Sequence, residues 1–369
     1  MSDHTRLSWT APQEPYVWLL GIGEPPGRKP DDSTLEEACQ FVLENWQVIG
    51  TAGPRLIAWA GPRFAEHPLI QRVRDRQVSV RTLGALQLLL MRRVAHAFTR
   101  RRLPYVFLKG SATRLVAYGD PLMRTGYDID MAVPGARIRE AEHELIQLGF
   151  SQAELDFELN QFVVADQGLR ASVEATHYEL GFLSRRQRVT DLSPEDEAAI
   201  RRDLPTQHPW HETPDGGVAC FVSIDLHHGL GPEIASEPVV YSSRQVVLDD
   251  TAMWVPAPHW MLYHLIYKLY WEGVHNYAKG GFQYADLCGL IARVQDADIP
   301  PLLALLHDHL FESGAYFVLR RIPSLGIELP RGLAAFVESM AHPPKTLKPV
   351  DPVWLNDLGD VWPKLWGGR

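Results

Sequence analysis

The residues of this 369-residue sequence that most clearly suggest chemistry are two aspartates separated by one residue, Asp128 and Asp130. They lie in residues 128–133, an apolar segment that predicts a short strand. Alternate residues of a strand point to the same face, so the two carboxylates lie side by side and Ile129 points into the core. Two adjacent carboxylates repel each other unless a cation lies between them, and such oxygen ligands suit Mg²⁺. The pair therefore predicts a divalent-metal site.

Polar residues upstream of this pair suit a phosphate group. Residues 105–108 predict a buried strand, and Lys109, Gly110 and Ser111 follow it at the start of an expected helix. Backbone N–H groups at such a junction can cradle a phosphate, and Lys109 and Arg124 add the charge to neutralise a triphosphate. A metal site beside a phosphate cradle indicates phosphoryl or nucleotidyl transfer.

A later segment offers a third carboxylate. Residues 218–227 predict a strand in which Ser223, Asp225 and His227 share one face. If this strand lies beside the Asp128 strand, Asp225 helps to hold the metal that activates an attacking hydroxyl, or takes the proton directly. His227 shares the face of Asp225 and is a candidate contact to substrate or metal.

Simpler roles are open for some of these side chains. Lys109 fits a solvated strand end, and Arg124 fits an ion pair with Asp120 or Asp128. The sequence also contains a comparison pair, Asp296 and Asp298, with the same spacing. Because Ile-Pro-Pro follows it, this pair predicts a helix cap rather than a metal site.

The composition limits the class of protein. Thirty-six basic residues against 45 acidic ones give a formal charge of −9, which argues against a long nucleic acid as partner. Three well-separated cysteines are too few for a disulfide framework. The start of the chain has no secretory h-region, and the longest apolar stretch, residues 83–90, is too short for a membrane span. We therefore expect a soluble cytoplasmic protein without membrane contact.

The chain divides into three expected regions. Residues 1–103 predict an irregular lead-in followed by helices, of which the last covers residues 80–102. Residues 104–256 carry the strands and the candidate site, with a charged, Pro- and Gly-containing insertion at about 183–217. Residues 257–369 predict a helical domain that ends in an irregular tail.

Together, the Lys-Gly-Ser run, the spaced Arg124, Asp-x-Asp and the later Asp-Leu-His resemble the nucleotidyltransferase superfamily typified by DNA polymerase β. They resemble most closely its bacterial branch of uncharacterised nucleotidyltransferases. The likeness covers residues 80–295, where a late helix with Tyr284, Asp286 and Leu287 fits the helical half of the family. It implies an α+β fold, with a small mixed sheet flanked by N-terminal and C-terminal helices.

The resemblance also implies roles for the residues. Asp128, Asp130 and Asp225 would be the catalytic acids and metal ligands, while Gly110 and Ser111 would bind the β- and γ-phosphates. The distance along the chain from Ser111 to Asp128 is longer than in compact members, and the insertion leaves Glu174 as the alternative third acid.

The implied reaction moves NMP from an NTP to a hydroxyl of a small-molecule acceptor and releases pyrophosphate, with two Mg²⁺ or Mn²⁺ ions. Antibiotic modification and natural-product tailoring are the nearest precedents. Protein AMPylation and transfer to a tRNA end, as in toxin-type members, are the competing reactions. A non-catalytic nucleotide-binding module is the rival class, and the intact acid pair argues against it. The sequence leaves the base of the NTP, the acceptor and the oligomeric state open.

Overall fold

The computed structural model describes residues 14–22, 25–27, 29–156, 161–164, 168, 177–204, 209–231, 234–270 and 281–340. It divides into two compact units: residues 1–70 with 258–369, and residues 71–257. None of the helices in these described ranges is both long and apolar enough to cross a bilayer. The division into three functional regions expected above stays a prediction.

The first unit is helical in its described part. Its elements are α1 (Glu14–Leu19), α2 (Asp32–Glu44), α3 (Ile49–Ala60), α10 (Pro258–Tyr270), α11 (Gly281–Ile291), α12 (Ile299–Asp308), α13 (Glu312–Leu319) and α14 (Arg331–Met340). Asp31 begins α2 by accepting a hydrogen bond from the Thr34 backbone N–H, as its position before an apolar-periodic segment predicts. Tyr284 and Asp286, the late-helix residues of the resemblance, lie buried in α11.

The second unit contains a mixed sheet in the strand order β1-β2-β7-β5-β3-β4, with β6 also paired to β7. The strands are β1 (Val106–Phe107), β2 (Asp128–Ala132), β3 (Ser151–Asp156), β4 (Gln161–Val164), β5 (Glu179–Val189), β6 (Trp210–Glu212) and β7 (Val218–His227). The pair β2–β7 is parallel and the other described pairs are antiparallel. The expected α+β class with a mixed sheet is confirmed.

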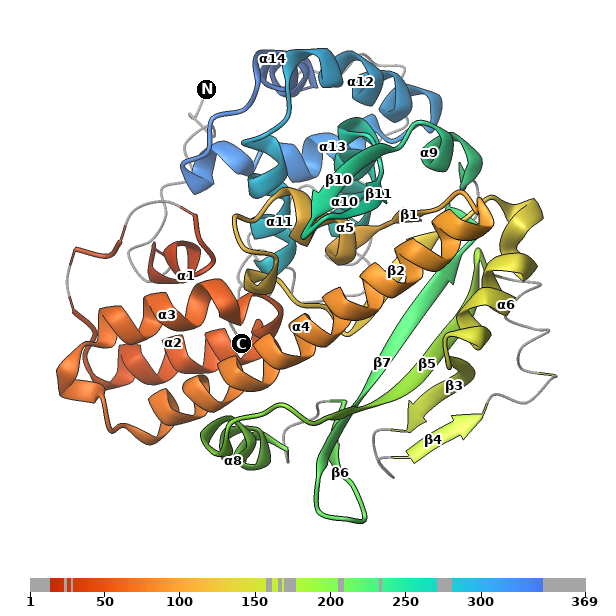
Figure 1. Cartoon of the computed structure of the whole chain (residues 1–369). Helices are drawn as coiled ribbons and strands as arrows, with labels where there is room; N and C mark the ends of the chain where they lie inside the picture. Colours follow the sequence, from red (N-terminus) through yellow and green to blue (C-terminus); the bar gives the residue numbers. More distant parts are fainter. Residues whose placement is uncertain are drawn as a thin grey trace. The chain divides into compact units, whose positions relative to one another are not determined.

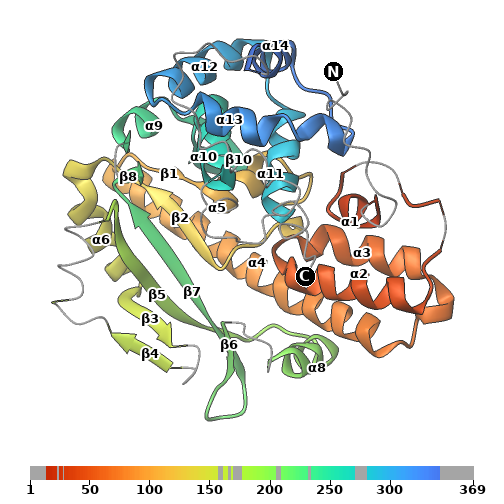
Figure 2. The same cartoon turned by 180° about the vertical axis from the view of Figure 1, so that it is seen from behind.

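Helices of this unit complete the fold around the sheet. They are α4 (Pro68–Arg101), α5 (Lys109–Val116), α6 (Ile138–Gln147), α8 (Pro194–Asp203) and α9 (Glu237–Tyr241). The long α4 and α6 lie on the same face of the sheet, in front of it in Figure 1 and behind it in Figure 2. Arg101 near the end of α4 forms an ion pair with Glu144 of α6, with 2.7 Å between Nε and Oε1.

The strand β7 lies at the centre of the sheet, and every residue in it except Ser223 is buried. A strand covered on both faces carries apolar residues at most positions, which explains the Val, Phe, Ile and Leu content of this segment. Ile129 of β2 and Ile224 of β7 are fully buried and pair in the same register. The sheet interior is therefore a rigid support for polar side chains at the β2–β7 pair.

One segment of this unit differs from the sequence-based expectation, and a further segment forms a separate hairpin. Residues 183–189, expected within an insertion, belong to β5, which pairs along its length with β7. Arg185, Arg186 and Arg188 lie in this strand, and their charge alone favours a loop over a strand. Residues 244–255 form the hairpin of β10 (Arg244–Leu248) and β11 (Thr251–Val255). Asp249 and Asp250 adopt the positive φ angles of 44° and 62° that a two-residue hairpin turn requires.

Candidate active site

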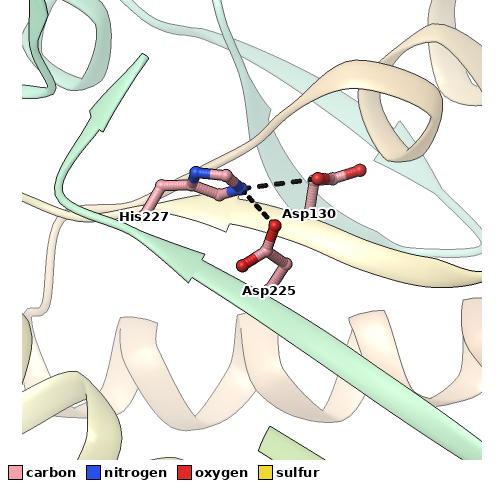
Figure 3. Close-up of side chains that lie close together, drawn as sticks. All are labelled: Asp130, Asp225 and His227. Atoms are coloured by element: carbon pink, nitrogen blue, oxygen red, sulfur yellow. Dashed lines mark hydrogen bonds and ion pairs between the residues drawn. The ribbon is translucent and has the colours of Figure 1, made fainter. Parts of the chain in front are cut away.

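The register between β2 and β7 brings the predicted acids together. Asp130 lies directly opposite Asp225, and Ala132 lies opposite His227. Because the two strands are parallel, residues in register have side chains on the same face of the sheet. Figure 3 shows Asp130 from β2 pointing toward Asp225 and His227 from β7. The condition stated for Asp225, that its strand lie beside the Asp128 strand, is therefore met.

These three side chains form a tight buried cluster. Nε2 of His227 lies 2.9 Å from Oδ2 of Asp225 and 3.4 Å from Oδ1 of Asp130. One ligand atom from each residue lies within 4.8 Å of the others, so the three side chains form a candidate metal-binding group. Asp130 and Asp225 are 5% exposed and His227 is fully buried.

Lys109 places a positive charge in the same cluster. Its Nζ lies 2.5 Å from Oδ1 of Asp130, 3.3 Å from Nε2 of His227 and 3.7 Å from Oδ2 of Asp225. The side chain is 14% exposed, so the simpler role of a solvated strand end does not apply. Lys109 is also the first residue of α5 and has a positive φ of 44°, a conformation that is uncommon outside glycine.

The charges in the cluster shift one another's pKa. Burial alone would lower the pKa of Lys109, but the carboxylates of Asp130, Asp225 and Asp128 outweigh it and raise the pKa above its usual value. Burial would raise the pKa of Asp225, but His227 and Lys109 outweigh it and lower this pKa. Burial and Lys109 would lower the pKa of His227, but Asp225 and Asp130 raise it. The cluster thus favours ionised carboxylates with a protonated Lys109 among them.

Asp128 lies at the start of β2, in register with Ser223, and is half-buried. It contributes to the field at Lys109 but is outside the three-residue metal group. Since residues i and i+2 of a strand share a face, its carboxylate lies on the same side of β2 as that of Asp130. Asp128 therefore lies beside the cluster, two residues before Asp130 on the same face of β2.

The phosphate-binding candidates lie at the first turn of α5. Gly110 is there because a Cβ at this position would lie 2.9 Å from Nη2 of Arg124. Ser111 is buried, and its Oγ accepts a hydrogen bond of 3.2 Å from the backbone N–H of Asp130. The side chain of Ser111 therefore links α5 to β2, while the first turn of the helix presents backbone N–H groups.

Arg124 lies buried against this turn, and a second buried arginine supports its loop. Arg124 donates a hydrogen bond from Nη1 to the carbonyl oxygen of Thr125. Arg114 donates to the carbonyl oxygens of Pro121 and Gly84, and to Oε1 of Gln87. Burial, with a smaller contribution from Arg124, lowers the pKa of Arg114 to about 9. These bonds fix the loop that carries Arg124 to helix α4.

The sequence reasoning missed Glu179, which lies opposite His227 in the β5–β7 pair. Its Oε2 is 3.6 Å from Nδ1 of His227, on the side of the ring away from Asp225. Burial and the nearby charge of Asp225 raise the pKa of Glu179. Tyr178 stacks on the His227 ring, with 5.6 Å between centroids and 18° between planes.

A bulge in β5 produces this placement. Phe182 pairs with Asp225, so a regular ladder would pair Leu180 with His227, but one extra residue brings Glu179 there instead. Gly181, within the bulge, has a positive φ of 77°, which glycine adopts at little cost. The glycine was the only signal in the sequence. Glu174, the alternative third acid, lies outside the described residues.

The sequence matches the family model for uncharacterised nucleotidyltransferases over residues 42–325, well over half of the chain. The chain belongs to this family. Among solved structures, the nucleotidyltransferase is similar to the antibiotic-resistance factor ANT(2'')-Ia, with 15% identity, a TM-score of 0.34, and coverage of 61% of this chain and 94% of the other. It is also similar to an antigenic nucleotidyltransferase-like protein from Paracoccidioides brasiliensis, with 15% identity, a TM-score of 0.30, and coverage of 68% and 97%. No curated protein matches the sequence.

Family membership makes the chain a transferase whose donor is a nucleoside triphosphate. The donor set of the nucleotidyltransferase fits a divalent cation, because two carboxylates and one imidazole offer ligand atoms that all lie within 4.8 Å of one another. The strands that supply these ligands belong to the sheet. The first turn of α5 and Arg124, from the loop before β2, are the candidates for phosphate binding and lie against each other.

Proposed function

We propose that this nucleotidyltransferase transfers NMP from an NTP to a hydroxyl group of a small-molecule acceptor and releases pyrophosphate. The observation that carries the proposal is the parallel β2–β7 register, which sets Asp130 against Asp225 with His227 beside them. The formal charge of −9 favours a small acceptor over a long polyanion.

Asp130, Asp225 and His227 would hold a divalent ion, Mg²⁺ or Mn²⁺, and Asp128 would complete a second site beside it. A metal bound there would stabilise the negative charge that develops on the phosphoryl oxygens and would lower the pKa of the attacking hydroxyl. The pKa of Asp225 is already lowered by His227 and Lys109, which favours a ligand over a proton acceptor. We therefore assign Asp225 to metal binding rather than to proton transfer in this proposal.

On the phosphate side, the first turn of α5 would receive the β- and γ-phosphates. Gly110 lets the Arg124 guanidinium approach this turn, so a phosphate at the helix N-terminus would meet both backbone N–H groups and a buried cation. Ser111 would act chiefly by holding β2 at a fixed distance from α5, because its Oγ bonds to the backbone of Asp130.

The test is pyrophosphate release with each of the four NTPs, Mg²⁺ or Mn²⁺, and a panel of hydroxylated acceptors. We expect release that needs one NTP, one acceptor and the metal, and that falls about a hundredfold or more in Asp130→Asn or Asp225→Asn. The double variant Asp296→Asn/Asp298→Asn is a matched control, because it removes the same Asp-x-Asp pattern from a helix start. This control should keep full activity.

Two results would contradict the proposal. Nucleotide that binds equally well in EDTA and to Asp130→Asn would favour the non-catalytic binding module. Transfer to a protein or to a tRNA end, with no turnover of small acceptors, would move the acceptor to the competing class while leaving the metal site intact.

A further inference from the structure

The ammonium of Lys109 contacts the same three side chains that form the metal-binding group. Its Nζ lies 2.5 Å from Asp130 Oδ1, 3.3 Å from His227 Nε2 and 3.7 Å from Asp225 Oδ2. Asp130 Oδ1 and Asp225 Oδ2 are also the oxygens that approach His227 Nε2. The Lys109 ammonium and a metal ion would therefore bind to the same carboxylate oxygens and imidazole nitrogen.

Two cations cannot use these atoms together at low cost. The three ligand residues are at most 5% exposed, so little solvent is present to screen repulsion between an ammonium and a divalent ion. A metal that binds to these atoms must therefore displace the Lys109 ammonium from them.

The Lys109 ammonium has an alternative position at the first turn of α5. It is the first residue of α5, so its backbone belongs to the helix turn next to Gly110 and the buried Arg124 guanidinium. Its four-carbon side chain rotates freely about several bonds, unlike the fixed fork of an arginine. A phosphate at this turn would offer the displaced ammonium new acidic oxygens within reach of the same backbone position.

We propose that the ammonium of Lys109 competes with the metal ion for these ligand atoms. The ammonium occupies them until the phosphates of a bound nucleotide attract it away. Metal and nucleotide then bind with positive coupling, since each favours the displaced position of one side chain, and the coupling is reciprocal. The proposal rests on the proposed function for the identity of the two ligands. It adds that metal binds weakly until nucleotide is present.

The first experiment uses Mn²⁺ alone and needs no nucleotide. Mn²⁺ binding is measured from the electron paramagnetic resonance signal of the unbound ion in wild type, Lys109→Met and Lys109→Arg. We expect Lys109→Met to bind Mn²⁺ about tenfold tighter or more, within the usual range of coupling between sites, and Lys109→Arg to stay weak. Lys109→Asn serves as a second uncharged variant, because asparagine tolerates the positive φ at this position.

Matched controls separate this effect from a general change of charge or fold. Arg202→Met removes a cation from another carboxylate with a 7% exposed side chain, Asp75, and should leave Mn²⁺ affinity unchanged. The melting temperature gives an independent readout: Mn²⁺ should raise it more in Lys109→Met than in wild type. Asp130→Asn should bind no Mn²⁺ in this range.

The second experiment measures binding of a non-hydrolysable analogue of the active NTP at matched free Mn²⁺. Wild type should show stronger mutual enhancement of metal and nucleotide binding than Lys109→Met. If wild type and Lys109→Met bind Mn²⁺ with equal affinity while Asp130→Asn does not bind it, the proposed competition by Lys109 is wrong, and the metal site itself is supported. Absence of Mn²⁺ binding in every folded variant would instead overturn the metal site, and with it the proposed function.

Discussion

Asp130 and Asp225 lie directly opposite each other in the parallel pair of β2 and β7, and both approach Nε2 of His227. The backbone hydrogen bonds of the sheet, rather than flexible loops, set the separation of these carboxylates. A metal-binding group built on paired strands is preorganised, because neither carboxylate needs a chain rearrangement to reach the other.

Replacement of Gly110 by alanine should impair the phosphate side of the site. The added Cβ would lie 2.9 Å from Nη2 of Arg124, so the guanidinium must move. A displacement of this size lowers catalytic efficiency by about ten- to a hundredfold, and we expect most of it in the KM for NTP. Steady-state kinetics measure the effect. Gly119→Ala is the matched control, since a Cβ there meets nothing within 4 Å. Equal kinetics for the two variants would contradict the role of Gly110.

The imidazole of His227 should influence which metal the site prefers. Nitrogen ligands suit Mn²⁺ better than Mg²⁺, which prefers oxygen, so His227→Asp should shift the ratio of affinities toward Mg²⁺. We expect a change in this ratio of about tenfold, the scale on which altered metal environments act. Isothermal titration with each ion gives the ratio. An unchanged ratio would place His227 outside the coordination sphere and leave it a substrate contact.

Arg76 and Asp203 form a buried ion pair that ties α4 to α8, with 2.8 Å between Nε and Oδ1 and side chains that are each 7% exposed. Arg76→Ala leaves a buried carboxylate without its cation, which costs about 3–5 kcal/mol of unfolding free energy. In the neighbouring pair, Arg202 is half-exposed, and Asp75 also accepts a hydrogen bond from Gln71 that remains when Arg202 is removed, so Arg202→Ala should cost only about 1 kcal/mol. Urea denaturation of both variants checks the difference. Similar losses of unfolding free energy in the two variants would show that the buried environment of the Arg76–Asp203 pair does not determine the cost.

His211 should make the fold sensitive to mild acid. Its ring stacks on Phe221 and accepts a hydrogen bond from Nε of Arg186, and burial and this arginine lower its pKa. His211 therefore binds a proton near pH 6.5 in the unfolded chain but only at lower pH in the folded chain. The free energy of unfolding falls as the pH drops below 6.5. His211→Gln keeps an acceptor for Arg186 and should weaken this dependence. Unfolding free energies of both proteins at pH 7.5 and pH 5.5 test it, and parallel changes would exclude His211 as a source.

The sequence predicted the strands of the candidate site well because their local patterns are strong. The expected strand at residues 218–227 has the bounds of β7, and the segment from Asp128 matches β2 to within one residue. In both, apolar residues alternate with the polar ones that meet at the cluster. The roles of these residues in catalysis stay predictions.

Other parts of the site could not be read from the sequence because they depend on contacts between distant segments. Glu179 reaches His227 only through the bulge at Gly181, and a single glycine in a charged segment does not specify a bulge. The contact of Lys109 with Asp225 and His227 depends on the order of strands in the sheet. Sheet order is a property of the whole unit, so spacing along the chain does not reveal it.

The β2–β7 pairing has a consequence for how such an enzyme can diversify. Adjacent strands lie about 4.8 Å apart whatever chain connects them, so the distance between Asp130 and Asp225 is independent of the length and content of that connection. Here the connection includes α6, the strands β3 to β5, and α8. Segments in it can therefore differ in length and content while the spacing of the two carboxylates stays constant.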